Sequence, residues 1–583
     1  MAIPSPKSNG TEVAYTYKSD QLVVALLPLR KDPEQNVSRL FRLPAGDVVS
    51  PFYVGSGRFF GIMVLQQAAS YKESDCHVNS SFNVWVNDPS NGERHQEKRA
   101  LDFTFNENVD KETRHRAAES FFLQATMAAG HDAVEFLMNL LVIFRDSSYA
   151  AHIHHIDVKV DRLADHQHLV VPTAQDCKAD EEVEDLLQGH VQSALEYAYP
   201  NSLTFDSLVE ALRAPPEVVE DFLNDLIEKK IVEQLESGEY IRVNQAAKTI
   251  EESKLHKSLT EKPPTIAIIT SLFLENLSVS RVVENANSLH MYNLNGDSNI
   301  YTIGNIGNHR VVVTKLSVIG DSREATISAG SITTRLLGNF QHVEHVLIVG
   351  VGGGVPSWTD PDQHVRLGDV VISSTRGGKG SAYVYGHDVV KKNGQITGVT
   401  TRRWNPKQET FIDLLHKNGD RIQKKWLENV DDLVHKINGE NTEKLDFTRP
   451  SSELDCIPLE TGVVVAHPNA SRLHPAFHEG TVASMMHYTA PLDDSIPRIP
   501  QPTPQELRHG FMKQCGAKAY DAGFDSVIAS IVGNCINSYA VIRGVADYHN
   551  GSSKVARPWQ PFASVTAAAF AKVLIESLPS KDK

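Results

Sequence analysis

One segment constrains the fold of this chain more than any other. His345–Gly350 is an apolar run of strand length, and it continues directly into Val351 and the three glycines Gly352 to Gly354. A short apolar run that ends in glycines is typical of a strand buried on both faces, as in a parallel sheet covered by helices. Glycines in a turn at its end would also let the backbone approach a ligand closely. The segment therefore predicts a buried strand, and a turn suited to a ligand, in an α/β domain.

The sequence on both sides of this run alternates between strand-like and helical segments. Thr265–Thr270 is another short apolar run, and Val311–Leu316 has the pattern of a strand. Ser328–Phe340 and Ala563–Leu578 have helical periodicity. Such alternation implies crossover helices between parallel strands. We therefore expect an α/β domain over residues 265–583, with a mixed, mostly parallel central sheet flanked by helices.

The composition disfavours several classes of protein. Acidic residues outnumber basic ones by 72 to 57, and the net charge of −15 argues against generic binding to nucleic acids or anionic membranes. No apolar run reaches the roughly 18 residues of a transmembrane helix, and the N-terminal region lacks the apolar core of a secretory signal. The five cysteines are widely spaced, which argues for a reducing compartment. We therefore expect a cytoplasmic protein without membrane segments.

Two further domains are expected before the α/β domain. Residues 10–172 combine strand-like runs with a helical pattern at Thr113–Phe144, which indicates an α+β domain whose role the sequence does not reveal. Residues 176–245 contain three helical segments and then two short strands joined by a Ser-Gly turn, an order that resembles a winged-helix domain. The charged stretch 251–264 ends in two prolines and is expected to be a linker.

The winged-helix segment is too acidic for a typical DNA reader. Between Asp176 and Arg242 it holds 17 acidic and 5 basic residues, a net charge of −12. DNA affinity depends on neutralising phosphates with lysine and arginine, and the expected recognition helix Glu217–Lys230 is itself acidic. This segment is therefore expected to bind a protein partner rather than nucleic acid.

Five segments of the C-terminal domain carry a specific pattern. They are YTIGNIGNHRVVV (301–313), HVLIVGVGGGVP with the following VRLGDVVIS (345–373), HEGTVASM (478–485), YAVIRGVADYHNG (539–551) and RPWQPFASVTAAAFAKVLI (557–575). In this order they resemble motifs of the nucleoside phosphorylase and methylthioadenosine/S-adenosylhomocysteine nucleosidase superfamily. The hairpin at 301–313 and the last three segments match eukaryotic and fungal members. One glycine-rich segment would be unspecific, whereas five in order are specific. The resemblance covers residues 264–578 and implies a phosphorylase/hydrolase-like fold.

The resemblance implies that Asp547 and Glu275 carry the chemistry. Cleavage of an N-glycosidic bond passes through an oxocarbenium-like sugar, so the leaving base must be protonated and a nucleophile must approach the anomeric carbon. The matching aspartate of the family protonates N7 of the purine, and the matching glutamate positions and deprotonates water. Asp547 lies just beyond a buried strand, where α/β sheets bind ligands, or else it caps the following turn. Glu275 follows the first strand, and its alternative is an exposed helix-surface position.

The ribose and the base are expected to contact a second group of residues. Asp525 stands where the family has the second glutamate of a Glu-Met-Glu motif, which reads Gly523-Phe524-Asp525 in this chain. Aspartate keeps the acceptor for ribose hydroxyls but is one methylene shorter, Asp521 competes for this role, and Asp525 could instead cap a helix. The other expected substrate contacts are Phe524, Tyr488, Ser484, Gly352 and Gly353. Phe524 and Tyr488 are equally typical of a protein core.

Water is favoured over phosphate as the nucleophile. Phosphate sites use arginine, and many phosphorylases of the family carry one where this chain has Ile348. Phosphate binding stays open through Ser322 and Arg323. A second basic feature, Arg376 and Lys379 around flexible glycines, could hold the phosphates of a nucleotide or form a solvated loop.

The sequence thus predicts a purine N-ribosyl hydrolase acting on methylthioadenosine, adenosine or ATP, coupled to N-terminal interaction domains. Some members that resemble this domain and carry sensor modules are ATP nucleosidases in immune defence, a role this domain order would suit. A phosphate-dependent phosphorylase and an inactive nucleoside-binding scaffold are the alternatives. No cofactor is expected, and no metal site, because the His152–His155 run lacks further ligands at suitable spacing. Family members usually form oligomers, so a homo-oligomer is expected.

Overall fold

In the computed structural model the chain forms two compact units. The first comprises Met1–Val171, Ser357–His364 and Glu453–Ala470, and the second comprises Pro172–Pro356, Val365–Ser452 and Ser471–Lys583. The structure describes residues 18–31, 35–48, 51–68, 76–87, 94–129, 132–164, 183–244, 248–249, 262–290, 299–317, 323–360, 363–376, 380–440, 445–459, 463–466, 472, 474–489, 501–551, 553 and 556–579. Most of the expected linker 251–264 lies outside these residues, and the expected domain limits stay predictions.

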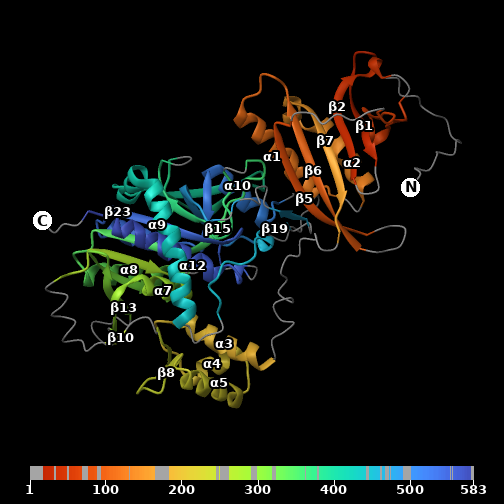
Figure 1. Cartoon of the computed structure of the whole chain (residues 1–583). Coiled ribbons are helices and arrows are strands. Elements are labelled where there is room, and N and C mark those ends of the chain that lie inside the picture. Colours follow the sequence, from red (N-terminus) through yellow and green to blue (C-terminus); the bar gives the residue numbers. More distant parts are fainter. Residues whose placement is uncertain are drawn as a thin grey trace. The chain divides into compact units, whose positions relative to one another are not determined.

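A nine-stranded sheet dominates the described part of the first unit (Figure 1). Its strand order is β19-β20-β5-β6-β7-β2-β1-β4-β3. The strands are β1 (Leu22–Lys31), β2 (Gln35–Pro44), β3 (Tyr53–Val54), β4 (Ile62–Val64), β5 (Val78–Asn87), β6 (Arg94–Phe105), β7 (Ile153–Arg162), β19 (Cys456–Pro458) and β20 (Val464–Ala466). Neighbours pair antiparallel, except that β1 and β4 are parallel. The unit is therefore an antiparallel sheet with helices, as an α+β class requires.

Two helices supply the apolar partner of this sheet. The helical pattern expected at Thr113–Phe144 is divided into α1 (Lys111–Met127) and α2 (Ala133–Asp146). The division has a local cause, because the Asp132 side chain accepts the backbone N–H of Glu135 and so begins a new helix. Phenylalanines of both helices meet those of the sheet edge to face, which closes the core of the unit.

The last two strands of this sheet come from a distant part of the chain. Residues 453–470 supply β19 and β20, and Val464 of β20 pairs with Asn83 of β5. Ser80 of β5 also donates a hydrogen bond to the carbonyl of Trp358, which belongs to the unit's other distant segment. No local sequence pattern indicated this pairing, because both partners of each contact are hundreds of residues apart.

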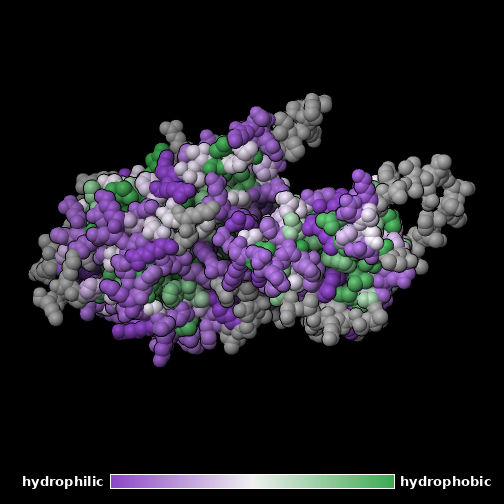
Figure 2. Space-filling view, turned by 90° about the horizontal axis from the view of Figure 1, so that it is seen from above, coloured by the Kyte–Doolittle hydropathy of each residue, from purple (hydrophilic) through white to green (hydrophobic). Residues whose placement is uncertain are grey.

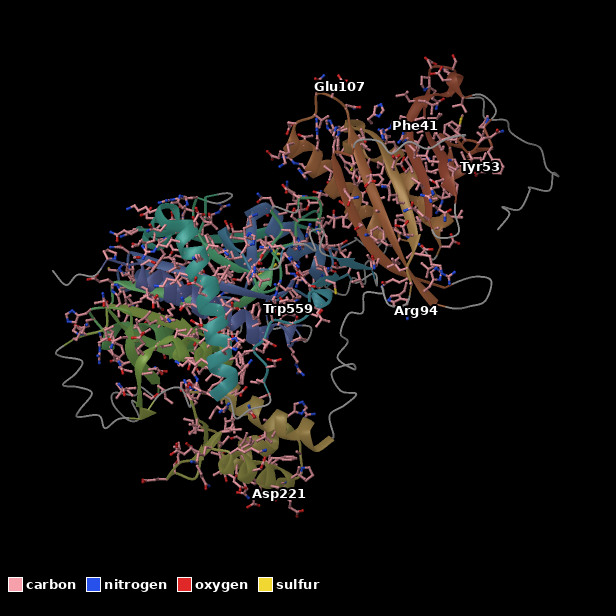
Figure 3. All side chains as sticks on the ribbon, viewed as in Figure 1. Phe41, Tyr53, Arg94, Glu107, Asp221 and Trp559 are labelled. Carbon is pink, nitrogen blue, oxygen red and sulfur yellow. The ribbon has the colours of Figure 1, made fainter. Side chains whose placement is uncertain are left out.

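The expected winged helix is confirmed as a small three-helix domain with a two-stranded wing. Its elements are α3 (Val183–Ala198), α4 (Phe205–Leu212), α5 (Pro216–Glu228), β8 (Val232–Gln234) and β9 (Tyr240–Arg242). Thr204 caps α4 by accepting the N–H of Ser207, and Pro216 opens α5. Apolar residues of the three helices and β8 form one buried cluster. Asp221 of α5 is exposed and points away from the ribbon (Figure 3).

A twelve-stranded mixed sheet forms the centre of the α/β domain. Its order is β10-β12-β13-β14-β11-β15-β23-β16-β21-β17-β18, and β22 pairs with both β15 and β21. The strands are β10 (Lys248–Thr249), β11 (Ile266–Thr270), β12 (Glu284–His290), β13 (Ile300–Ile306), β14 (His309–Lys315), β15 (His345–Gly354), β16 (Val370–Ser373), β17 (Tyr383–Lys392), β18 (Gln395–Trp404), β21 (Phe477–Met485), β22 (Ala517–Tyr520) and β23 (Ser538–Asp547). The central strands β14, β11, β15 and β23 are parallel, so their carboxyl ends share one edge.

Helices cover this sheet and bury its central strands. They are α7 (Phe273–Val282), α8 (Arg323–Asn339), α9 (Thr410–Glu440), α10 (Pro504–Cys515), α11 (Asp525–Gly533) and α12 (Gln560–Glu576). Helix α12 is apolar on nearly all sides because it packs on β15 and β23 and also on α7 and α9. Trp426 of α9 is buried on α12, where its indole N–H donates to the Thr566 carbonyl at 2.9 Å. Helix α9 therefore covers α12.

The face of the molecule drawn in Figure 2 is largely polar. Figure 2 shows a mostly hydrophilic face with smaller hydrophobic areas. In the first unit Phe52, Tyr53 and Val54 are exposed at the edge strand β3, and Tyr53 is labelled in Figure 3. Within the described residues, no helix combines the length and the apolar character that crossing a bilayer requires.

Gly544 tests the packing of α12 on the sheet. A Cβ at this position of β23 would overlap the carbonyl oxygen of Ala563 in α12. Gly544→Ala is therefore expected to lower the free energy of unfolding by about 3 kcal/mol or more in denaturant titrations. Gly338→Ala in α8 meets no atom within 4 Å and should leave that free energy unchanged or raise it by up to ~1 kcal/mol. Equal stability of the two variants would contradict this packing.

Candidate functional site

The glycine segment is not the expected turn but the end of a buried strand. Gly350 to Gly354 extend β15, with Gly352 opposite Val545 of β23 and Gly353 opposite Asp547. The pattern of an apolar run before glycines predicted the strand, but it placed the strand's end four residues too early. The glycines stay extended because both neighbouring backbones, β23 and β22, pair with them. Their role in substrate binding stays a prediction.

Glu275 lies directly against this glycine strand. Its Oε1 accepts the backbone N–H of Val351 at 2.7 Å, and a Cβ on Gly350 would overlap its carboxylate. Its Oε2 accepts the N–H and hydroxyl of Ser271, both at 2.8 Å, and the N–H of Leu272 at 2.9 Å. The side chain is only 2% exposed. Glu275 thus occupies a buried inner position of α7, where it joins the helix start to the central sheet.

Asp547 ends β23 and holds the turn that follows it. Its Oδ1 accepts the N–H groups of His549 and Gly551 at 2.8 and 2.7 Å. Its Oδ2 accepts the N–H of Ser553 at 3.2 Å and the Ser553 hydroxyl at 2.5 Å. The residue is buried, and all four donors come from the next six residues. The carboxylate therefore caps this turn, whatever else it does.

The two expected catalytic residues, Glu275 of α7 and Asp547 of β23, both contact strand β15. Glu275 bonds to Val351, and Asp547 pairs with Gly353, two residues further along β15. Two residues of strand advance the chain by about 7 Å. Both side chains therefore lie at the carboxyl-terminal edge of the parallel strands, which is where α/β sheets bind ligands.

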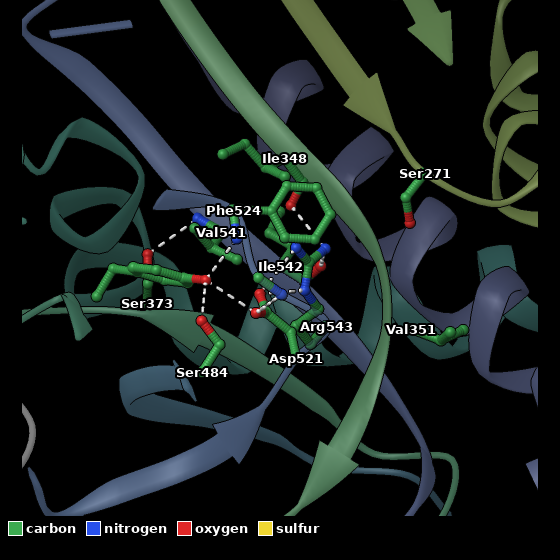
Figure 4. A network of polar contacts seen from close by, with 12 residues as sticks. Ser271, Ile348, Val351, Ser373, Ser484, Asp521, Phe524, Val541, Ile542 and Arg543 are labelled. Carbon is green, nitrogen blue, oxygen red and sulfur yellow. Dashed lines mark hydrogen bonds and ion pairs between the residues drawn. The ribbon is translucent and has the colours of Figure 1, made fainter. Parts of the chain in front are cut away.

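A buried ionic network beside these residues was not expected from the sequence (Figure 4). The Arg543 guanidinium contacts the Asp521 carboxylate at 3.1 Å, and the Phe524 ring lies over it with 4.3 Å to the ring centroid. The Tyr383 hydroxyl donates to Asp521 at 2.9 Å, accepts from the Phe524 N–H and meets the Ser484 hydroxyl at 2.7 Å. Burial and the Asp521 charge raise the pKa of Tyr383 well above its usual value, so the hydroxyl stays a donor.

This network gives three expected substrate residues a structural partner. Phe524 covers Arg543, and Ser484 is fully buried at the Tyr383 hydroxyl. Asp525 accepts from the Arg402 guanidinium and from the Trp404 indole N–H, both at 2.7 Å, which fixes α11 to the hairpin of β17 and β18. A signal for the Asp521–Arg543 pair existed in their charges, but their pairing depends on the tertiary fold.

A cavity of about 410 Å³ opens at this edge of the sheet. Its lining comes from α8, β17, α10 and α11, from β21 and β22 with the segments that follow them, and from the segment after Asp547. The lining residues are Thr326, Tyr385, Met485, Met486, His487, Tyr488, Pro504, Arg508, Tyr520, Asp521, Ala522, Gly523, Asp525, Ser526, His549 and Asn550. Burial and the positive charge of Arg508 lower the pKa of His549, so its imidazole is neutral near pH 7. The cavity has three tyrosines, which suits a flat ligand.

Of the expected phosphate ligands, Arg376 does not line this cavity, and the others lie outside the described residues. Arg376 is paired with Asp413 at 2.5 Å and approaches Glu409 at 3.4 Å. Ser322, Lys379 and the side chain of Arg323 lie outside the described residues. Within the described residues, no group of three histidine, cysteine, aspartate or glutamate side chains is arranged to hold a metal ion.

Comparisons with known proteins match two parts of the chain. Residues 176–244 match the family model of a winged helix-turn-helix domain. A nucleotide-binding leucine-rich repeat (NLR)-like protein of Hyaloscypha variabilis is 25% identical over 303 residues, which are 48% of this chain and 26% of that protein. The chain thus spans about a quarter of this relative's length.

Several solved structures are similar to about half of the chain. The methylthioadenosine/S-adenosylhomocysteine nucleosidase of Neisseria meningitidis, in complex with methylthio-immucillin-A, has 14% identity and a TM-score of 0.32 over 54% of this chain and 99% of its own. The futalosine hydrolase of Helicobacter pylori has 13% identity and a TM-score of 0.31 over 54% and 98%.

The buried pair of Asp521 and Arg543 is expected to be important for stability. Asp521→Asn leaves the Arg543 charge buried without its counter-charge and should lower the free energy of unfolding by about 3–5 kcal/mol. Asp413→Asn is the matched control, because it breaks a largely exposed pair with Arg376 worth under ~1 kcal/mol. Scanning calorimetry of the full chain measures both. Similar melting temperatures of the two variants would contradict the buried ion pair.

Proposed function

We propose that the α/β domain hydrolyses the N-glycosidic bond of a purine nucleoside or nucleotide. The observation that carries this function is that Glu275 and Asp547 both contact one glycine-rich strand, β15, near a cavity whose lining includes His549 and Asn550, just after Asp547. A pair of carboxyl groups supplies the acid and the water-activating group that glycoside hydrolysis needs. The collinear motifs that resemble the nucleosidase superfamily support the same assignment.

Asp547 is the proposed general acid toward N7 of the base. Its carboxylate now accepts four hydrogen bonds within the turn, so contact with a base requires that one donor be exchanged. The Ser553 hydroxyl is the simplest to exchange, because it can rotate whereas the backbone donors are fixed. Protonated Asp547 would then donate to N7 as the bond to ribose breaks, which leaves a neutral purine.

Glu275 is the proposed residue that positions and deprotonates water. A carboxylate oxygen has two acceptor sites, and the N–H of Val351 occupies one site of Oε1. The second site is proposed to accept a proton from the water that attacks the anomeric carbon. The three bonds from Ser271 and Leu272 fix the other oxygen, so the carboxylate keeps its orientation.

The cavity is the proposed place of the base and ribose. Tyr488 lines it and is held there by a hydrogen bond from its hydroxyl to the Pro502 carbonyl at 3.2 Å. The neutral His549 also lines it, two residues after Asp547. Asp525 reaches the cavity although its carboxylate is bonded to β18. The proposed substrates are methylthioadenosine, adenosine and ATP.

Water is the proposed nucleophile, with phosphate as the alternative. Arg376, the described basic residue expected to hold phosphates, has its charge balanced by Asp413 and Glu409. The position that carries arginine in many phosphorylases is the fully buried Ile348. Both features favour hydrolysis over phosphorolysis.

A nucleoside-binding scaffold without catalysis is the second candidate. One specific feature favours it, since Glu275 and Asp547 each accept four hydrogen bonds from nearby backbone N–H and serine hydroxyl groups, which fix both carboxylates in the fold. Such carboxylates can be purely structural. Binding of a nucleoside without release of base would identify this candidate.

We further propose that the domain works inside a regulated assembly. The acidic winged helix offers an exposed acidic helix, α5, to a protein with a basic surface. The NLR-like relative is consistent with a multidomain effector, and a homo-oligomer is proposed for the α/β domain.

Release of free base tests the proposed reaction. Purified full chain is incubated with methylthioadenosine, adenosine or ATP, with and without phosphate, and free adenine is measured by chromatography. Adenine should appear without phosphate, and Asp547→Asn should lower kcat/KM by at least about 100-fold because a general acid contributes that much or more.

Asp432→Asn on the exposed side of α9 is the control for this experiment, and it should keep full activity. Circular dichroism checks that both variants are folded. Adenine formed only with phosphate would replace hydrolysis by phosphorolysis. Undiminished turnover in folded Asp547→Asn would remove the proposed general acid.

A further inference from the structure

The winged helix packs against α7, the helix that carries Glu275. Arg242 at the end of β9 is 1% exposed, and its guanidinium lies 4.3 Å from the ring centroid of Phe273, the first residue of α7. The ring of Tyr199, just after α3, meets the same phenylalanine edge to face at 5.3 Å. Arg242 is itself fixed by Glu196 at 3.2 Å and by the Ile231 carbonyl at 2.9 Å. The first turn of α7 is therefore packed against the core of the winged helix.

A second contact fixes the middle of α7. Asn244, which follows the wing, is buried and donates to the Asn276 side chain at 3.0 Å and to the Ser280 hydroxyl at 3.2 Å. Asn276 is the neighbour of Glu275 in sequence. These polar groups are all buried, so a break leaves unsatisfied donors and acceptors inside the protein.

A third contact joins the sheet to the end of α3. Lys315 at the end of β14 is buried and donates to the carbonyls of Tyr199 at 2.6 Å and Leu316 at 3.0 Å. A cation at the carbonyl end of a helix is favourable. Burial lowers the pKa of Lys315 to about 8, while the charges of Glu275 and Glu196 act in the opposite direction. The positive charge of Lys315 thus interacts with the carboxylates of Glu275 and of Glu196 in the winged helix.

A cavity lies beside these contacts between the winged helix and the α/β domain. A cavity of about 500 Å³ separates α3 from the starts of α7 and α12, and Ser271 and Lys315 are among the residues that line it. Ser271 is the residue whose N–H and hydroxyl hold Glu275. Part of the space between α3 and α7 is therefore a cavity, and the contacts of Arg242, Tyr199 and Asn244 join α7 to the winged helix beside it.

We propose that Arg242, Asn244 and Lys315 are positioning residues for Glu275, through which the winged helix sets the geometry of the α/β site. Displacement of the winged helix loosens α7 and withdraws Glu275 from Val351. The part of this role that concerns turnover rests on the proposed hydrolase function, whereas the dependence of α7 on the winged helix does not.

Hydrogen exchange of the full-length chain tests the coupling. In Asn244→Ala, amides of residues 273–282 should exchange about three- to tenfold faster than in the parent, because two buried hydrogen bonds are lost. Phe273→Leu removes the aromatic ring of α7 that contacts Arg242 and Tyr199, and it should give the same change. Lys229→Ala, at an exposed i,i+4 pair of the winged helix away from α7, is the matched control and should leave these amides unchanged.

Exchange at α7 decides the outcome whether or not the winged helix stays folded. Faster exchange of 273–282 in both variants and not in the control supports the coupling, and unchanged exchange in both overturns it, even if amides of α5 are exposed. If the chain turns over nucleosides, Asn244→Ala should lower kcat more than it raises KM. A chain without turnover removes the proposed hydrolase function while the exchange result still stands.

Discussion

The structure depends on the close approach of one carboxylate to one strand backbone. Glu275 accepts the N–H of Val351 because Gly350 beside it has no side chain. The same carboxylate fixes Ser271 and Leu272, so it joins the central strand to the helix that begins after β11. A buried carboxylate without such donors would be strongly unfavourable. Gly350 of β15 thus makes room for the protein's own Glu275 side chain.

Local sequence patterns predicted helices and strands better than they predicted which side chains contact one another in the fold. The apolar run before Gly350 and the two wing strands were both predicted from the sequence pattern. The partner of Arg543 was not, since Asp521 lies 22 residues away and Tyr383 lies 138 residues from Asp521. Charge and hydroxyl groups carry no periodicity, and only the folded sheet brings them together. The two strands that 453–470 adds to the first unit were missed for the same reason.

The site residues show the same division. Resemblance of motifs singled out Glu275 and Asp547 as candidates, and both contact β15 in the structure, while their catalytic roles stay predictions. It could not foresee that Asp525 would bond Arg402 and Trp404, because β17 and β18 were not recognised as a hairpin. The acidity of the winged helix could be predicted from its composition. The contact of its buried Arg242 with the Phe273 ring of α7 could not, because it depends on the tertiary fold.

A crystal structure of the full chain with adenine tests the central claim most directly. The account predicts adenine in the cavity lined by Tyr488 and His549, with its N7 within hydrogen-bond distance of the Asp547 carboxyl group and the Ser553 hydroxyl turned away. Adenine bound elsewhere, or bound there while Asp547 keeps all four bonds to its own turn, would contradict it.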